Sequence, residues 1–353
     1  MMSKAPKSHS LRFEIVDWLK AWAILAVILD HMEIVPEHLV IWSVNVFVLV
    51  TAAVYSIPGY AFTFKKLMSK LAYLVFIYAM GIFLIDLIFG LLHEKLDRSV
   101  LPVLLNPYFM FVKNPYLGDV WYLGLHVQIL IVFYVFLKGA GRSRGEYVVL
   151  IAALISQTSF LVTHYFMDRF ETIFVLSWFF YLAAGFYGMR PLLTKIRSLE
   201  QYRLFGWMIG AGILIVVYLC WPEVPWLFQN ENRARGLMLP LYFGLILFLA
   251  ELFYLLDGIL LGRWLKQGMN FLGRYTLAVY LTHQAFLYLW DKLFDSRAFL
   301  AVLAVSSGLL FGMTVEYLFN FLRSALSRIA VEAAWGRKKG LDLVIPDEIK
   351  KGA

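Results

Sequence analysis

The chain has 353 residues, of which 61% are hydrophobic and only 16% are charged, and this composition excludes an ordinary soluble globular protein. Its formal net charge of +8 is explained by basic cytoplasmic loops, so no nucleic-acid partner is expected. The single cysteine, Cys220, excludes an intramolecular disulfide. No Cys/His cluster has the spacing of metal ligands, so we expect no bound metal.

Long apolar runs, separated by clusters of charged or turn residues, recur along the whole chain. A helix needs about 20 residues to cross a hydrocarbon core about 30 Å thick. About ten such helices are expected, near residues 14–34, 39–57, 70–92, 119–137, 147–166, 172–189, 204–221, 236–256, 271–291 and 298–322. The sequence therefore predicts an all-α, polytopic protein of the cell (inner or plasma) membrane, whose partner along every span is the lipid bilayer.

The basic residues predict the orientation of these helices. If the N-terminus is cytoplasmic, most of the 32 Lys and Arg fall in cytoplasmic connections, and the excess recurs in each pair of loops. Both termini are therefore expected in the cytoplasm. We expect one integral-membrane domain over residues 1–322 and a basic cytoplasmic tail over residues 323–353, which begins as an amphipathic segment.

The first apolar run, "FEIVDWLKAWAILAVILDHMEI", contains Asp17, Lys20, Asp30 and His31, which are costly inside a membrane. On an ideal helix Lys20 and His31 differ by only about 20° in direction, and Asp17 lies within about 60° of both. The axial gap from Lys20 to His31 is about 16 Å, with Lys20 toward the cytoplasm. This face is expected to line a polar interior, although a local Asp17–Lys20 ion pair and an interfacial histidine are simpler alternatives.

Further histidines fall in the outer halves of later spans. His126 follows Trp121 in "VWYLGLHVQ", about 10 Å below the expected outer surface. Tyr280 and His283 in "RYTLAVYLTHQ" share one helix face, as a hydroxyl and an imidazole must to handle a proton together. The three imidazoles are expected to converge on one outward-facing cavity, although a single membrane histidine is often a helix–helix hydrogen-bonding group.

These segments, in this order, resemble the integral-membrane acyltransferase family 3. Members open with an Asp-Gly-Leu-Arg-like element, an apolar stretch and a histidine, and here "DWLK" and "AWAILAVILD" precede His31. The segment "VWYLGLHVQ" is similar to the family's Trp-(Phe/Tyr)-Leu segment, and "RYTLAVYLTHQ" to its Ser/Thr-x-x-x-Tyr-x-x-His segment. Lys20 stands where the family usually has arginine.

The resemblance implies an O-acyltransferase that moves an acyl group, usually acetyl, from cytoplasmic acetyl-CoA or another acyl-CoA to a hydroxyl of an extracytoplasmic glycan or lipid-linked saccharide. The acyl-CoA is a donor substrate, and no permanently bound cofactor is expected. In this reading Lys65, Lys66 and Lys70 attract the phosphates of CoA, and Lys20 holds a phosphate or the thioester carbonyl.

The same reading assigns His31 as general base, or as carrier of a covalent acyl group, with Asp30 adjusting its basicity and Asp17 pairing with Lys20. Trp121, His126, Tyr280 and His283 are expected to bind the acceptor. Two alternatives remain open: a proton-coupled transporter or exporter, since Asp, Lys and His on one face also suit a proton relay, and an inactive scaffold for envelope biosynthesis.

Overall fold

The structure is a computed structural model, which describes residues 8–34, 42–55, 63–91, 121–137, scattered positions from 147 to 158, 178–188, 231–256 and 259–342. Across these ranges the regular structure is helical and contains no strand, in agreement with the predicted all-α class. The helices are α1 (Ser8–His31), α2 (Trp42–Tyr55), α3 (Phe64–Leu91), α5 (Trp121–Val132), η4 (Phe133–Leu137), α7 (Phe179–Ala183), η7 (Ala184–Gly188), α11 (Glu231–Leu255), α12 (Leu260–Arg274), α13 (Thr276–Asp291) and α14 (Arg297–Asp342).

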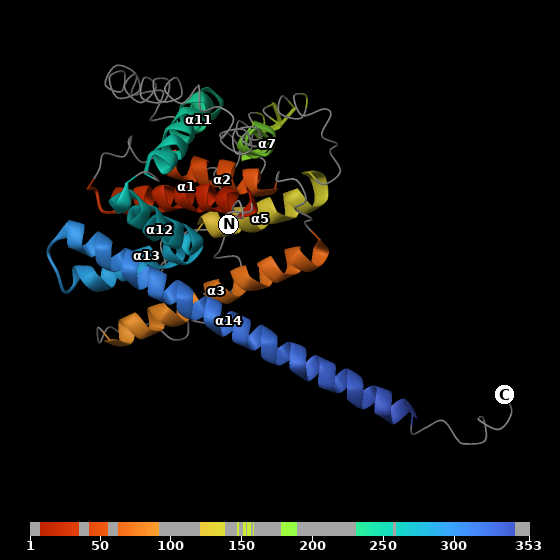
Figure 1. The fold of residues 1–353 in the computed structure, drawn as a ribbon. Helices are drawn as coiled ribbons and strands as arrows, with labels where there is room; N and C mark the ends of the chain where they lie inside the picture. Colours follow the sequence, from red (N-terminus) through yellow and green to blue (C-terminus); the bar gives the residue numbers. More distant parts are fainter. Residues whose placement is uncertain are drawn as a thin grey trace, which may run out of the picture.

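Helix α1 lies at the centre of the molecule (Figure 1). It packs against α2 and α11 on one side and against α12 and α13 on the other, and α13 in turn packs against α3 and α14. Many of its apolar residues, among them Ile15, Leu19 and Ile24, are fully buried. Its polar residues Lys20 and His31 are less buried and line cavities between α1 and its neighbours.

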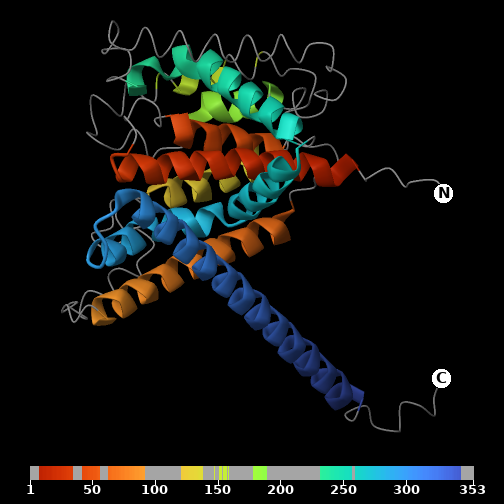
Figure 2. The same cartoon turned by 60° about the vertical axis from the view of Figure 1, so that its left-hand side comes forward.

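Two of the described helices, α3 over Phe64–Ile88 and α14 over Arg297–Arg328, are long and apolar enough to cross a membrane. Shorter apolar helices cover Ser43–Tyr55, Tyr122–Val135 and Gly244–Leu255. The expected span 204–221, most of 147–166 and residues 172–177 fall outside the described residues, so the number of ten stays a prediction. Figure 2 shows that the N-terminal end of α1 and the C-terminal end of α14 face the same side of the molecule.

Helices α12 and α14 differ from the sequence-based expectation. The helix expected over residues 271–291 is divided at Tyr275, and the preceding residues form a separate amphipathic helix, α12, whose exposed side carries Leu260, Leu261 and Trp264. Helix α14 continues without a break to Asp342. The expected boundary between membrane domain and tail, at residues 322 and 323, therefore lies inside one continuous helix.

Candidate active site

The polar face of α1 begins with an ion pair. Lys20 Nζ lies 3.5 Å from Asp17 Oδ1, and both side chains are about 30% exposed (28% and 29%). The pair has the i, i+3 spacing that the sequence indicated, since neighbouring turns bring these positions together. It holds the lysine head group at a cavity wall instead of leaving it free to extend to bulk water.

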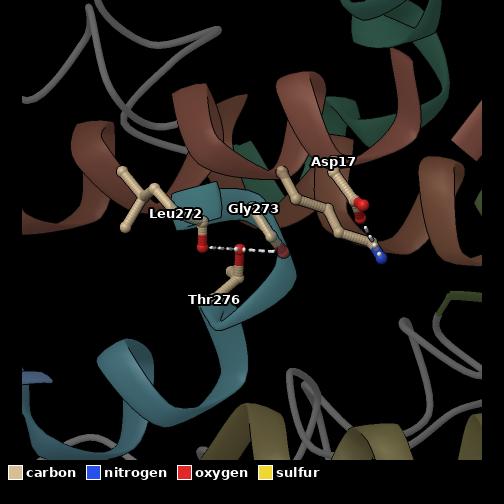
Figure 3. Close-up of polar contacts among 5 residues, drawn as sticks. Asp17, Leu272, Gly273 and Thr276 are labelled. Atoms are coloured by element: carbon tan, nitrogen blue, oxygen red, sulfur yellow. Dashed lines mark hydrogen bonds and ion pairs between the residues drawn. The ribbon is translucent and has the colours of Figure 1, made fainter. Parts of the chain in front are cut away.

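The end of α12 fixes the position of this pair (Figure 3). Gly273 lies so close to α1 that an added Cβ would overlap the carbonyl group of Asp17. The Thr276 hydroxyl donates to Gly273 O at 2.8 Å and lies 3.3 Å from Leu272 O, so it binds carbonyls that the end of a helix leaves without intrahelical partners. The junction of α12 and α13 is therefore held rigidly against Asp17.

A cavity of about 170 Å³, here called the basic cavity, opens beside this junction. Six helices contribute polar side chains to it. These are Lys20 from α1, Thr51 and Tyr55 from α2, Lys70 from α3, Tyr122 and His126 from α5, and Arg274 and Tyr280 from α12 and α13. Three cations around one cavity attract an anion, and the hydroxyl and imidazole groups supply further hydrogen bonds.

Lys70 is positioned by Tyr55. Its Nζ donates to the Tyr55 hydroxyl at 3.3 Å and lies 5.4 Å from the centre of that ring, and Tyr55 is itself stacked on Phe133. On the same wall, His126 Nδ1 is buried and has no hydrogen-bond partner among the residues that the structure describes. A buried polar atom without a partner is costly, which favours a polar ligand in this cavity.

A second cavity of about 330 Å³, here called the histidine pocket, lies at the other end of α1. Its polar lining is His31, Glu33, Tyr288, Asp291 and Arg297. The Arg297 guanidinium lies 3.6 Å from a Glu33 carboxylate oxygen and 3.4 Å from the Met32 carbonyl. These exposed groups offer donors and acceptors of the kind that bind hydroxylated ligands.

His31 is held by two residues of α13. Its ring centroid lies 5.0 Å from that of His283, and its Nε2 lies 3.3 Å from Gln284 Nε2. Which of the two groups donates depends on the histidine tautomer and on the orientation of the Gln284 amide. The contact orients a ring nitrogen that can act as a general base when it is unprotonated.

A continuous row of rings connects the two cavities. From His31 it passes to His283, then to Tyr280 at 5.7 Å, to Tyr122 at 5.5 Å and to His126 at 5.9 Å. His283 is 1% exposed, its Nδ1 contacts the Tyr280 carbonyl, and its Nε2 is without a hydrogen-bond partner in the described parts of the chain. The row forms the wall between the basic cavity and the histidine pocket.

The expected site residues thus divide between two places. Lys20, Lys70, His126 and Tyr280 meet in the basic cavity. His31 and His283 meet at the other end, so the expected convergence of three histidines on one cavity is only half fulfilled: His126 faces the basic cavity instead. The reason is its position on α5, which presents it to Lys70 and not to the end of α1.

Three other expected residues do not line these cavities, and the side chain of a fourth is not described. Lys65 and Lys66 are exposed at the start of α3, five and four residues before Lys70. Lys65 points about 140° away from Lys70 and borders another groove, whereas Lys66 lies one turn nearer the helix end and does not line the basic cavity. Asp30 is half-buried beside His31. Trp121 is the first residue of α5, and its side chain lies outside the described residues.

Several cavity residues were not expected from the sequence. Tyr55, Thr51 and Tyr122 line the basic cavity without any preceding motif, because aromatic and hydroxyl residues are common in apolar helices. Arg274 carried a usable signal, since it opens the segment "RYTLAVYLTHQ" that suggested Tyr280 and His283. As a basic residue at the cytoplasmic end of an expected span, however, it also fits the general excess of Lys and Arg on that side.

The family model described as an acyltransferase domain, that of acyltransferase family 3, matches residues 13–321. The chain belongs to acyltransferase family 3. The match includes every side chain that lines the basic cavity and the histidine pocket of this family 3 acyltransferase. Neither a search of the curated proteins nor a search of the solved structures found a match.

Proposed function

We propose that this family 3 acyltransferase is a multi-pass protein of the cell membrane that transfers an acetyl group from cytoplasmic acetyl-CoA to a hydroxyl of an extracytoplasmic glycan or lipid-linked saccharide. The observation that carries the proposal is the pair of cavities on α1: one is basic, the other is lined by His31, and a single row of rings lies between them. An acyltransferase that works across a membrane needs a donor site and an acceptor site at different depths.

The basic cavity is proposed to hold the donor. Lys20, Lys70 and Arg274 match the phosphates of an acyl-CoA, because charge-assisted hydrogen bonds to such groups are stronger than neutral ones. Of the three lysines expected to attract CoA, Lys70 is the one beside Lys20 and His126. Lys65 and Lys66 are assigned at most to the attraction of the anionic donor toward the protein.

The histidine pocket is proposed to hold the acceptor. His31 Nε2 removes the proton from the acceptor hydroxyl, whose oxygen attacks the thioester carbonyl carbon. The new ester C–O bond forms, the C–S bond breaks, and CoA leaves as a thiolate that takes up a proton. Asp291 and Arg297 in this pocket supply an acceptor and a donor for neighbouring sugar hydroxyls, and Asp30 is assigned to adjusting the basicity of His31.

The wall between the cavities determines where the acyl group passes. About 16 Å separates Lys20 from His31 along α1. The pantetheine arm of the donor is therefore proposed to extend from the basic cavity past Tyr280 and His283, with the thioester next to His31. Asp17 contributes by holding Lys20 through the 3.5 Å ion pair.

Reconstitution in liposomes tests the proposal. Radiolabelled acetyl-CoA is supplied on the face that carries the N-terminal end of α1 and soluble glycan acceptors on the other, with wild-type protein, His31→Ala and Lys20→Arg compared. We expect transfer by wild type, none above background by His31→Ala, and retained transfer by Lys20→Arg. Transfer by His31→Ala would overturn the assignment of the base. Absence of CoA binding together with a pH-dependent solute flux would instead show a transporter.

A further inference from the structure

A long groove lies between α3 and α14, outside both cavities. The two helices cross where Phe319 of α14 contacts Tyr73 and Phe76 of α3, with ring centroids 5.2 and 5.5 Å apart. Beyond the crossing α14 diverges from α3 (Figures 1 and 2). The wedge between them has a volume of about 1310 Å³, above the roughly 300–1,000 Å³ of pockets for small ligands, so it suits a long molecule.

The lining of this groove is amphipathic along its length. Toward the crossing it is apolar, with Leu71, Val75 and Phe76. Toward the start of α3 it gains polar groups beside apolar Met68, Leu322 and Leu326; these are Lys65 and Ser69 from α3 and Arg323, Ser324 and Ser327 from α14. A ligand that fits must therefore carry an anionic or hydrogen-bonding end and a long apolar part.

The position of the groove indicates that such a ligand would come from the lipid bilayer. Helices α3 and α14 are the two described helices long and apolar enough to cross a membrane, and Val75 and Leu326 at the groove are 50% and 65% exposed. Lys65 and Arg323 lie at the same end of the groove, which is the end that the charge distribution assigns to the cytoplasmic face. Anionic phospholipids of that leaflet attract basic side chains at this depth.

We infer that the groove between α3 and α14 is a binding site for an anionic phospholipid, with its phosphate at Lys65 and Arg323 and one acyl chain along Val75, Phe76 and Phe319. A further cavity of about 390 Å³ joins the groove to the basic cavity: it shares Ser69, Phe319 and Asn320 with the groove and Lys70 and His126 with the basic cavity. The lipid would therefore form part of the wall of the donor site.

Binding of phosphatidylglycerol and phosphatidylcholine to the delipidated full-length protein, measured by native mass spectrometry in detergent, tests the head-group site. We expect Lys65→Gln with Arg323→Gln to lower the affinity for phosphatidylglycerol roughly 10- to 30-fold and to remove its preference over phosphatidylcholine. The matched control is Lys66→Gln with Arg328→Gln, which removes two neighbouring exposed charges that do not line the groove. Equal affinity for the two lipids in wild type, or equal losses in both double variants, would overturn the proposal.

A second pair of variants tests the chain site. Val75→Trp places a large ring in the groove, whereas Val302→Trp adds the same ring to an exposed position of α14 outside it. We expect Val75→Trp to reduce retained phosphatidylglycerol at least tenfold and Val302→Trp to leave it unchanged. Equal retention by both variants would show only non-specific contact with bilayer lipid. A dimer that Val75→Trp dissociates would assign the groove to a second copy of the chain, and either result would overturn the proposal. Neither lipid-binding experiment measures acyl transfer. A failure of the lipid-site proposal can therefore be distinguished from a failure of the proposed function.

Discussion

The imidazole ring of His31 in α1 lies 5.0 Å from that of His283 in α13, although 252 sequence positions separate them in a chain of 353 residues. His283 is buried and in contact with its own helix through the Tyr280 carbonyl, whereas His31 faces the histidine pocket. The buried ring therefore limits how the exposed ring can turn. This relationship suits His283 to positioning the proposed base, while His31 is the residue proposed to touch the substrate.

Replacement of the two histidines should have different kinetic effects. His31→Ala is expected to lower kcat by about 10²- to 10⁴-fold, the usual contribution of a general base. His283→Phe keeps a ring of similar shape beside His31 and is expected to lower kcat by less than His31→Ala, with the KM for the acyl donor unchanged. Steady-state kinetics on reconstituted protein measure both values. A larger loss of kcat in His283→Phe than in His31→Ala would contradict these roles.

The basic cavity predicts which lysine of the α3 segment binds the donor. Lys70 lines the cavity beside Lys20, whereas Lys66 is exposed outside it. Lys70→Gln should raise the KM for acyl-CoA about 10- to 100-fold, because a charge-assisted hydrogen bond contributes about 1.5–3 kcal/mol. Lys66→Gln, the matched control, should change it less than threefold. Similar KM increases in both variants would indicate attraction by the general positive charge and no specific donor contact.

The contact of Gly273 with α1 predicts a position-specific effect of alanine. A methyl group at Gly273 would overlap the backbone of Asp17, and overpacking of this kind costs about 1–3 kcal/mol, so Gly273→Ala should lower the Tm in detergent and displace Lys20. Gly268 is in the same helix and an added Cβ there meets nothing within 4 Å. Gly268→Ala should therefore raise the Tm, since alanine favours a helix by about 1 kcal/mol over glycine. Equal Tm shifts in the two variants would contradict the close approach of Gly273 to α1.

The indole of Trp18 predicts a difference between two neighbouring tryptophans. Trp18 is fully buried and donates through Nε1 to the Leu249 carbonyl of α11 at 2.8 Å, whereas the buried Nε1 of Trp22 has no partner among the described residues. Trp18→Phe should cost about 1 kcal/mol more in unfolding free energy than Trp22→Phe, because only the first loses a buried hydrogen bond. Thermal unfolding of both variants in the same detergent compares them. A more stable Trp18→Phe protein would show that the bond to α11 contributes nothing.

Local periodicity explains why part of the site was predictable. The alignment of Asp17, Lys20 and His31 on one face follows from the pitch of a single helix, and the Asp17–Lys20 pair forms as that pitch requires. The grouping of Tyr280 with His283 has the same origin, and their rings lie 5.7 Å apart. Both relationships involve residues within one helix, where sequence spacing and direction are directly linked.

Contacts between different helices do not follow from the periodicity of a single helix. The spacing of Lys65, Lys66 and Lys70 does not determine which of them faces α1. That depends on how α3 is rotated about its axis when it packs against α5 and α13. His126 was assigned to the outer cavity from its depth alone, yet the direction of its side chain brings it to Lys20 and Lys70. Depth follows from position along a helix, but direction depends on the neighbours.

The sequence by itself determined the helical class, the family and the polar face of the first helix, because composition, ordered motifs and the pitch of one helix are properties of the chain alone. Only the tertiary structure decided that the proposed site is two cavities and not one, and that His283, Tyr280 and Tyr122 form the wall between them. The physical reason is that α1, α5 and α13 are distant in sequence, so their mutual rotation is set by packing: the close approach of Gly273 to Asp17 and the burial of Trp18 against α11.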